Sequence, residues 1–266
     1  MIEAFFELHG LPFGRSVPVV ELLRTDSWDE LHARMLHTAG IRGFGVFTGD
    51  TGTGKTTALR RFAEALDSNR YRVLYVCDSF LTPRNFYWEV LHQLGCTPRF
   101  YRGDAKRQFH KALKEVNEDR KCPVVVVDEA HLLSREMLEE IRFLLNTGMD
   151  SGSALALLLA GQSELKETLK LQVNQAIAGR VDMRFHLEAM DKQQTASYVA
   201  QHMKAVKAPR EIFTSSALLM IHEYAGGIAR KVNKVASTCL MTAAVRKEAL
   251  VDDHLVREVL ESEFEI

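Results

Sequence analysis

Cysteine is scarce in this sequence, and its few occurrences are far apart. The four cysteines, Cys77, Cys96, Cys122 and Cys239, form no CxxC pair and have no histidine at metal-ligand spacing. This pattern argues against a zinc site and against a fold held together by disulfides. It is typical of reduced, buried thiols in a cytosolic protein.

Long apolar runs are also missing. The longest, Ala154–Ala160, is far shorter than the roughly 20 residues that a membrane-spanning helix needs. The N-terminal MIEAFFELHG has no basic region followed by an apolar run, so no signal peptide is expected. We therefore expect a cytoplasmic protein with no membrane partner.

The sequence also lacks an excess of positive or negative charge. The chain has 34 Lys and Arg against 35 Asp and Glu, which gives a net charge of -1 and a pI near 6.8. Any contact with nucleic acid must therefore come from a local basic patch. The 266 residues, 46% of them hydrophobic, show no repeat or low-complexity linker. They fit one large domain, or one domain with a smaller companion.

Strand-like and helix-like patterns alternate up to about residue 190. Strands are expected at 44–48, 72–77, 123–127, 154–160 and 183–187. Helices are expected between them, at 27–37, 56–66, 83–94, 105–117, 134–146 and 164–171. This alternation predicts an α/β fold with a parallel sheet covered by helices on both faces. The segment 5–23 is expected to be irregular, because prolines interrupt it.

Only helical patterns follow Asp191. They are expected at 192–204, 215–224, 229–246 and 252–263. The change from mixed to purely helical patterns places a domain boundary near residue 190.

A glycine-rich turn matches the GxxxxGK[ST] pattern completely and lies between an expected strand and an expected helix. It reads Gly49-Asp50-Thr51-Gly52-Thr53-Gly54-Lys55-Thr56, followed by Thr57. Its glycines let backbone N–H groups face phosphates, and the following helix adds its dipole. We expect Lys55 to neutralise the β- and γ-phosphates of ATP and Thr56 to bind Mg²⁺. The alternative is a chance glycine-rich turn.

Two carboxylates end the most apolar expected strand. The four valines Val124–Val127 lead directly to Asp128 and Glu129. Ligands of open α/β sheets bind at the carboxyl ends of the strands. We expect Asp128 to hold Mg²⁺, directly or through water, and Glu129 to orient and polarise the attacking water. His131 follows closely, but no second ligand at suitable spacing supports a metal site, so we interpret it as a polar residue of the motif.

Several segments together resemble AAA+ ATPases of the ExeA-like and TniB-like group, which includes general-secretion ATPases and transposon-encoded helper ATPases. They are the P-loop, Val127–Leu133, Gly226–Arg230, Gly10–Gly14 and Met137–Asn146. The two nucleotide motifs are specific only for P-loop NTPases, and the other segments carry the narrower assignment. The resemblance covers nearly the whole chain. It implies an N-terminal linker segment at 1–34, an AAA+ α/β nucleotide-binding core at 35–190 and a small C-terminal helical lid at 191–266.

The same resemblance implies three further site residues. Gln162 occupies the position of a sensor-1 residue that reads the γ-phosphate, and Arg230 that of a sensor-2 arginine. Arg180 occupies the position of an arginine finger that acts across a subunit interface, with Arg184 as the alternative. Each also has a structural interpretation, as a helix-start residue or a surface arginine. A finger acting in trans makes a ring or helical filament part of the mechanism.

The densest basic stretch contains six cations, Arg99, Arg102, Lys106, Arg107, Lys111 and Lys114. The spacing of Arg107, Lys111 and Lys114 places them on one helix face. Such a face can hold the phosphates of duplex DNA regardless of sequence. The alternative is a solvated face, because acids such as Asp104 and Glu115 are interspersed. The resemblance favours DNA.

Three classes of function remain open. The resemblance implies a Mg²⁺-dependent ATPase that oligomerises on duplex DNA and recruits or activates a transposase; a clamp or helicase loader is closely related. The second class is a secretion-type ATPase. ExeA proteins also carry a membrane span and a periplasmic region that this sequence lacks, which we take as counting against that class. The third is a switch that binds ATP without rapid turnover. We predict the first.

Overall fold

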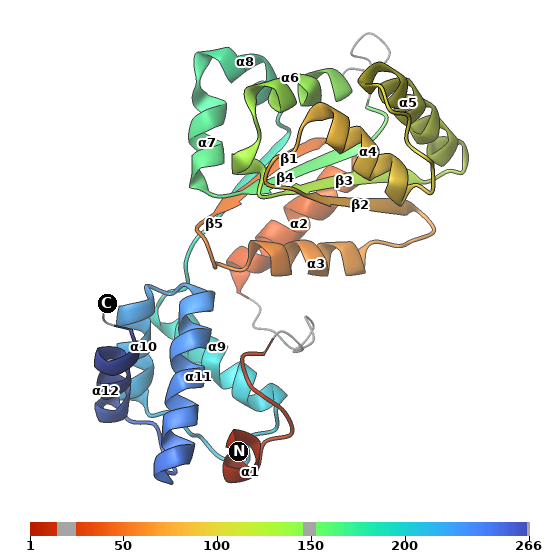
Figure 1. Cartoon of the computed structure of the whole chain (residues 1–266). Coiled ribbons are helices and arrows are strands. Elements are labelled where there is room, and N and C mark those ends of the chain that lie inside the picture. Colours follow the sequence, from red (N-terminus) through yellow and green to blue (C-terminus); the bar gives the residue numbers. More distant parts are fainter. Residues whose placement is uncertain (15–24, 146–152, 265–266) are drawn as a thin grey trace. The chain divides into compact units, whose positions relative to one another are not determined.

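The computed structural model describes residues 1–14, 25–145 and 153–264 (Figure 1). The chain forms two compact units. The sheet unit comprises Ser27–Gly49 and Ala58–Leu187, and the helical unit comprises Met1–Asp26, Asp50–Thr57 and Glu188–Ile266. None of the helices in the described ranges combines the length and the apolar character needed to cross a membrane.

The sheet unit is built on a parallel sheet with the strand order β2-β3-β4-β1-β5. The strands are β1 (Phe44–Gly49), β2 (Tyr71–Cys77), β3 (Cys122–Asp128), β4 (Ala156–Gly161) and β5 (Met183–Leu187). Every residue of β1, β3 and β4 is buried, as expected for central strands covered on both faces. The edge strands β2 and β5 are partly exposed.

Helices cover both faces of this sheet (Figure 1). One face packs against α2 (Asp26–Gly40) and α3 (Lys55–Ala65). The other packs against α4 (Pro83–Gln93), α5 (Arg102–Glu118), α6 (Arg135–Leu144), α7 (Ser163–Lys170) and α8 (Gln175–Ala178). Because side chains alternate along a strand, Val124 and Val126 of β3 join the first core, and Val125 and Val127 join the second. The predicted fold class is confirmed.

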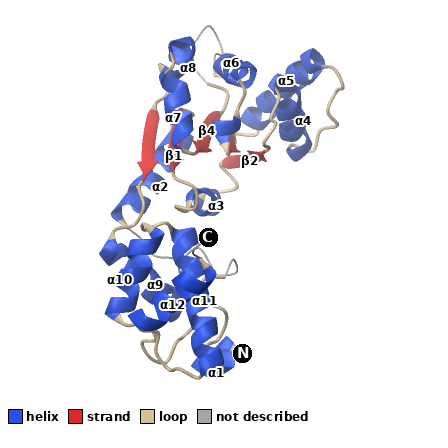
Figure 2. Ribbon diagram, turned by 60° about the vertical axis from the view of Figure 1, so that its left-hand side comes forward, coloured by secondary structure: helices blue, strands red, loops and turns tan. Residues whose placement is uncertain are grey.

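The helical unit has a separate core. Its helices are α1 (Ile2–Phe6), α9 (Lys192–Ala205), α10 (Ser215–Ala225), α11 (Ala229–Arg246) and α12 (Asp253–Glu263). Figure 2 shows α9 to α12 packed around one another. Phe6, Leu8 and Phe13 of the N-terminal segment are buried in the same core. The His9 N–H donates to the Val206 carbonyl at 2.9 Å, which fastens this segment to the end of α9.

The structure differs from the sequence expectation near the N-terminus. Residues 2–6 form helix α1, so the expected irregularity of 5–23 does not hold for its first residues, while 15–24 lie outside the described residues. Residues 27–34, expected in a linker, belong to α2 and pack on the sheet. Helix α6 ends at Leu144, with Leu145 as its C-terminal capping residue, which is earlier than the expected end at 146; residue 146 lies outside the described residues.

Candidate active site

Asp128 is a buried carboxylate at the end of β3. Its relative exposure is 2%, and both of its oxygens are hydrogen-bonded. The Tyr75 hydroxyl donates to Oδ2 at 2.9 Å, and the Glu129 N–H donates to Oδ1 at 2.9 Å. The carboxylate is therefore fixed at the carboxyl edge of the sheet, where the sequence predicts it.

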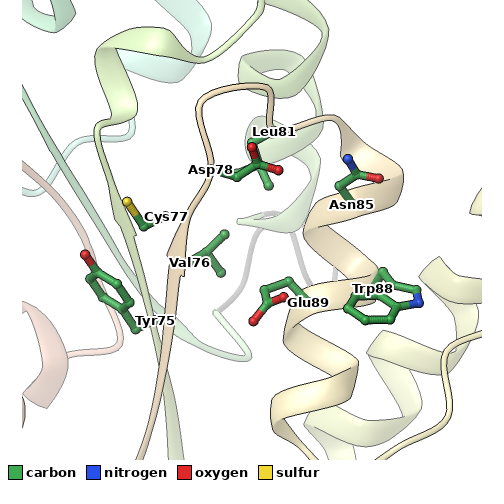
Figure 3. A pocket seen from close by; sticks show the side chains of 8 residues that line it. All are labelled: Tyr75, Val76, Cys77, Asp78, Leu81, Asn85, Trp88 and Glu89. Carbon is green, nitrogen blue, oxygen red and sulfur yellow. The ribbon is translucent and has the colours of Figure 1, made fainter.

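Tyr75 was not among the predicted site residues. It lies on β2, where it pairs in register with Val126, two positions before the pairing of Cys77 with Asp128. Tyr75 and Cys77 point to one side of β2 and Val76 to the other (Figure 3). Burial, together with the charge of Asp128, raises the pKa of Tyr75 above its ordinary range. The hydroxyl therefore stays protonated and remains a donor to Asp128.

Glu129 differs from its neighbour in both backbone and exposure. Its φ of 53° and ψ of 32° place it in the left-handed region, which residues other than glycine rarely adopt. Its side chain is 41% exposed, and Oε2 lies 3.5 Å from Nδ1 of His131. The pair thus offers one buried, fixed carboxylate for a cation and one accessible carboxylate for a water.

Gln162 is the N-terminal capping residue of α7, directly after β4. Its side-chain nitrogen lies 2.9 Å from Nε2 of His131, and its backbone N–H donates to Nδ1 of the same ring at 3.4 Å. The structure therefore brings Gln162 next to the loop that carries Glu129. The link is His131, which the sequence interpretation treated only as a polar residue of the motif.

The predicted arginine finger lies between α8 and β5. The Arg180 Nη1 donates to the carbonyl of Arg142, in the last turn of α6, at 3.1 Å. The alternative, Arg184, is exposed on β5 and donates to the carbonyl of Ala178 at 2.6 Å. The finger assignment stays a prediction.

The P-loop has the backbone that its glycines predict. Gly52 and Gly54 have φ values of 87° and 106°, which favour glycine strongly. The Thr53 hydroxyl and the Lys55 ammonium both donate to the Asp50 carbonyl at 2.9 Å. The loop is thus closed upon itself by its own polar side chains, and Lys55 stands at the first turn of α3.

The start of α11 is held against the P-loop within the helical unit. The Arg230 N–H donates to the Gly52 carbonyl at 3.1 Å, and a Cβ on Gly52 would lie 2.8 Å from Cβ of Arg230. Gly227, with a φ of 72°, lets the turn before α11 pack against Met190, because a Cβ there would lie 1.9 Å from the Met190 carbonyl oxygen. The structure therefore brings the predicted Arg230 together with the phosphate-binding loop.

Two of the six predicted DNA contacts have another partner. Arg102 and Lys106 on α5 both bind Glu140 of α6, whose side chain is only 5% exposed. The buried Tyr87 hydroxyl also donates to Glu140. Burial alone raises the pKa of Glu140, but the hydrogen bonds from Lys106, Tyr87 and Arg102 outweigh it and lower the pKa to about 2. These two cations therefore balance a buried carboxylate.

The remaining cations of α5 form a narrower exposed basic face. The side chains of Arg107, Lys111 and Lys114 are 78%, 79% and 78% exposed. Their partners Asp104, Glu115 and Glu118 lie on the same helix, three or four residues away. Such exposed pairs are weak, about 0.3–0.5 kcal/mol each, so phosphates can replace the acids. Arg99 lies on the loop before α5, where its backbone N–H donates to Gln108 at 3.1 Å.

A pocket of about 450 Å³ lies between the carboxyl end of β2 and α4 (Figure 3). Its lining is Tyr75, Val76, Cys77, Asp78, Leu81, Asn85, Trp88 and Glu89. Two of these eight side chains are carboxylates, and none is a lysine or arginine. That lining disfavours phosphate, so the nucleotide assignment rests on the two motifs rather than on this pocket.

Comparison with known proteins finds a family match, a related sequence and similar folds. Residues 39–169 match a family described as AAA domain. General secretion pathway protein A of Aeromonas hydrophila is 30% identical over 257 residues, which cover 92% of this chain. The chain spans 45% of the length of that curated relative.

Solved structures share the fold. Cdc6p from Pyrobaculum aerophilum matches with a TM-score of 0.73 and 19% identity, covering 96% of this chain and 71% of that one. The Drosophila ORC bound to DNA also matches with a TM-score of 0.73 and 19% identity, covering 97% of this chain and 65% of that one. At this identity the likeness shows a common fold and no more.

Proposed function

We propose, from the match of residues 39–169 to the AAA domain family and from the shared fold, that the protein binds ATP with Mg²⁺ and hydrolyses it. The observation that carries the proposal is the fixed, buried Asp128 beside the accessible Glu129 at the end of β3. The P-loop sequence supports the same proposal independently, because Gly52 and Gly54 have positive φ values of the kind that phosphate-binding loops use.

The residues fit Mg²⁺ as a cation carried by the nucleotide. Within residues 1–14, 25–145 and 153–264, no group of three or more His, Cys, Asp or Glu is placed to hold a metal by itself. Protein-bound Mg²⁺ commonly uses one or two protein oxygens together with phosphate oxygens and water. Asp128 and the Thr56 hydroxyl are those oxygens in our proposal. The bound ion would neutralise charge that develops on the phosphates.

Each remaining residue has a defined task in the reaction. Lys55 neutralises the β- and γ-phosphates, and Glu129 orients and polarises the attacking water. Gln162 and Arg230 contact the nucleotide phosphates. Arg180 acts on the nucleotide of a neighbouring copy, which makes self-assembly part of the reaction.

Turnover by two variants tests the ATPase proposal. Lys55→Ala removes the phosphate-binding cation, so ATP binding and turnover should both fall. Glu129→Gln keeps binding but should lower turnover by roughly 100-fold or more, because the amide cannot polarise water. Glu139→Gln, at an exposed position of α6, is the matched control. Undiminished hydrolysis by Glu129→Gln would remove Glu129 from the mechanism.

We further propose that the protein assembles on duplex DNA as a ring or helical filament and acts as a transposition helper that recruits or activates a transposase. The exposed basic face of α5 supports the DNA part, because it suits phosphates irrespective of sequence.

The second candidate is a secretion-type ATPase module. The 30% identity to General secretion pathway protein A over 92% of this chain favours it. Electron microscopy with duplex DNA, under ATP, a non-hydrolysable analogue, ADP and no nucleotide, separates the two. Nucleotide-dependent assemblies on the duplex support the transposition helper. Assemblies that form without binding the duplex under every nucleotide condition support the secretion module.

A further inference from the structure

We propose that His131 is a positioning residue that ties the orientation of Glu129 to Gln162. The proposal rests on the proposed ATPase function and deepens it. In this proposal, the orientation of the Glu129 carboxylate, which activates water, depends on the position of the Gln162 amide, which senses phosphate. His131 touches neither phosphate nor water in this scheme and acts through its two neighbours.

The first support is the position of the imidazole between the two side chains. Nδ1 of His131 lies 3.5 Å from Oε2 of Glu129, and Nε2 lies 2.9 Å from the side-chain nitrogen of Gln162. The imidazole is 11% exposed, so water competes little for these contacts. Glu129, by contrast, is 41% exposed and has a long, flexible side chain. A largely buried neighbour therefore lies against the partly exposed side chain of Glu129.

The second support is the backbone that holds His131. A Cβ added to Gly161, the last residue of β4, would lie 2.9 Å from the backbone nitrogen of His131. The turn at 130–132 is thus packed directly on the residue before Gln162. The Leu132 N–H closes this turn on the Glu129 carbonyl at 2.9 Å. The loops after β3 and β4 are therefore in close contact at this point.

Nδ1 of His131 faces two groups, the Gln162 backbone N–H, which donates to it at 3.4 Å, and Oε2 of Glu129 at 3.5 Å. With the proton on Nδ1, the imidazole presents N–H to the Glu129 carboxylate, and Nε2 accepts from the Gln162 amide. With the proton on Nε2, Nδ1 accepts from the Gln162 backbone N–H instead, and the carboxylate has no donor from this ring. The link that we propose uses the first arrangement, a directed chain from the Gln162 amide through the imidazole to the carboxylate.

The chain predicts a consequence of ATP binding. A γ-phosphate that draws the Gln162 amide toward itself also changes the contact at Nε2 of His131. Because the same imidazole also lies against Glu129, a change in its contact with Gln162 also changes its contact with the Glu129 carboxylate. Hydrolysis then depends on His131, while nucleotide binding, which uses the P-loop, does not.

Steady-state kinetics with nucleotide-binding measurements tests this separation. His131→Ala should lower kcat roughly 10- to 100-fold, since a small misplacement of a catalytic group has effects of that size. The dissociation constant for ATP should change less than about threefold. His131→Asn, which keeps an N–H near the Nδ1 position, should recover part of kcat. His92→Ala, at an exposed histidine of α4, is the control.

A double-mutant cycle tests the coupling itself. His131→Ala with Gln162→Ala should have a kcat no lower than the worse single variant, because both break the same chain. Multiplicative losses would overturn the link, as would a His131→Ala kcat within twofold of the unmodified protein.

Nitrogen NMR of ¹⁵N-histidine-labelled protein gives a readout that needs no turnover. The His131 signals, assigned with His131→Ala, report which ring nitrogen carries the proton; the proposed link requires it on Nδ1, and a proton on Nε2 alone would overturn the link. Gln162→Ala should shift Nε2, and Glu129→Gln should shift Nδ1. If the unmodified protein fails to hydrolyse ATP, the proposed function falls while these shifts still support the link. Unchanged shifts in both variants would overturn the link even in an active ATPase.

Discussion

The hydroxyl of Tyr75 on β2 donates a 2.9 Å hydrogen bond to Asp128 at the end of β3. Tyr75→Phe removes this donor and leaves a buried carboxylate oxygen with fewer partners. Without nucleotide, the free energy of unfolding should fall by about 1–3 kcal/mol. With Mg²⁺ and ATP the loss should be smaller, because the cation takes up the carboxylate.

Urea unfolding with and without Mg²⁺ and ATP measures both values. Tyr101→Phe, at a tyrosine that is 72% exposed, is the control and should change neither. A Tyr75→Phe loss of equal size under both conditions would contradict a cation at Asp128.

Local patterns in the sequence were sufficient to predict the five strands and the longer helices, but they did not predict the short helices α1 and α8. Helix α11 begins at Ala229 and ends at Arg246, as expected, because a glycine pair precedes it and a continuous pattern follows. The five strands lie within two residues of their expected ranges in the described structure. Alternation of strands and helices also predicts the parallel sheet.

The same local patterns could not predict contacts between elements that are distant in the sequence. Tyr75 meets Asp128 only because β2 pairs with β3 in one register, and no motif includes that tyrosine. Arg102 and Lys106 have the composition of a DNA-binding stretch, yet they meet Glu140 once α5 packs against α6. Partners of this kind depend on three-dimensional packing, which spacing along one helix does not encode.

The buried Glu140 predicts a specific loss of stability in acid. Its pKa in the folded protein is about 2, compared with an ordinary 4.5. A lowered folded-state pKa contributes stability that is present above the unfolded pKa and is lost as the pH falls through the folded one. The contribution should therefore be full above pH 4.5 and should decline between pH 4.5 and about 2.

Glu140→Gln isolates this contribution. At pH 7 the free energy of unfolding of the variant should be about 2 kcal/mol lower than that of the unmodified protein. This figure is reduced for solvent screening, because Arg102 and Lys106 are partly exposed. The difference from the unmodified protein should shrink as the pH is lowered from 4.5 to 3. Chemical unfolding across this range measures it, with Glu136→Gln, at an exposed partner of Arg102, as control. A difference that grows in acid would contradict the assigned direction.

The exposed basic face of α5 predicts the salt dependence of DNA binding. Lys111→Ala with Lys114→Ala should weaken binding equally for unrelated duplex sequences, because phosphates carry no sequence information. The slope of log affinity against log salt should become shallower by about 2, near 0.9 for each lost phosphate contact.

Fluorescence anisotropy with two unrelated duplexes over a range of salt measures this slope. Lys166→Ala with Lys170→Ala, on exposed positions of α7, is the matched control and should leave it unchanged. Equal effects of both pairs would mean that overall charge, rather than this helix face, sets the affinity.

If Arg180 acts on the nucleotide of a neighbouring subunit, two variants that are inactive alone should be active when mixed. Arg180→Ala should lower turnover at least roughly 100-fold while leaving ATP binding intact, as for loss of an arginine finger. Lys55→Ala should be inactive for the opposite reason, because it retains Arg180 and lacks the phosphate-binding lysine. Neither variant alone has a complete site if the finger acts across an interface.

Mixing the two variants restores complete interfaces. In a random equal mixture, about one interface in four joins an intact P-loop to an intact finger, so turnover per subunit should approach one quarter of the unmodified rate. A mixture of Arg180→Ala with the Lys55→Ala, Arg180→Ala double variant provides no finger and should stay inactive. Restoration in the first mixture alone requires a finger acting in trans. An inactive first mixture, with both proteins folded and assembled, would place Arg180 in its own subunit's site or in the structural contact with Arg142.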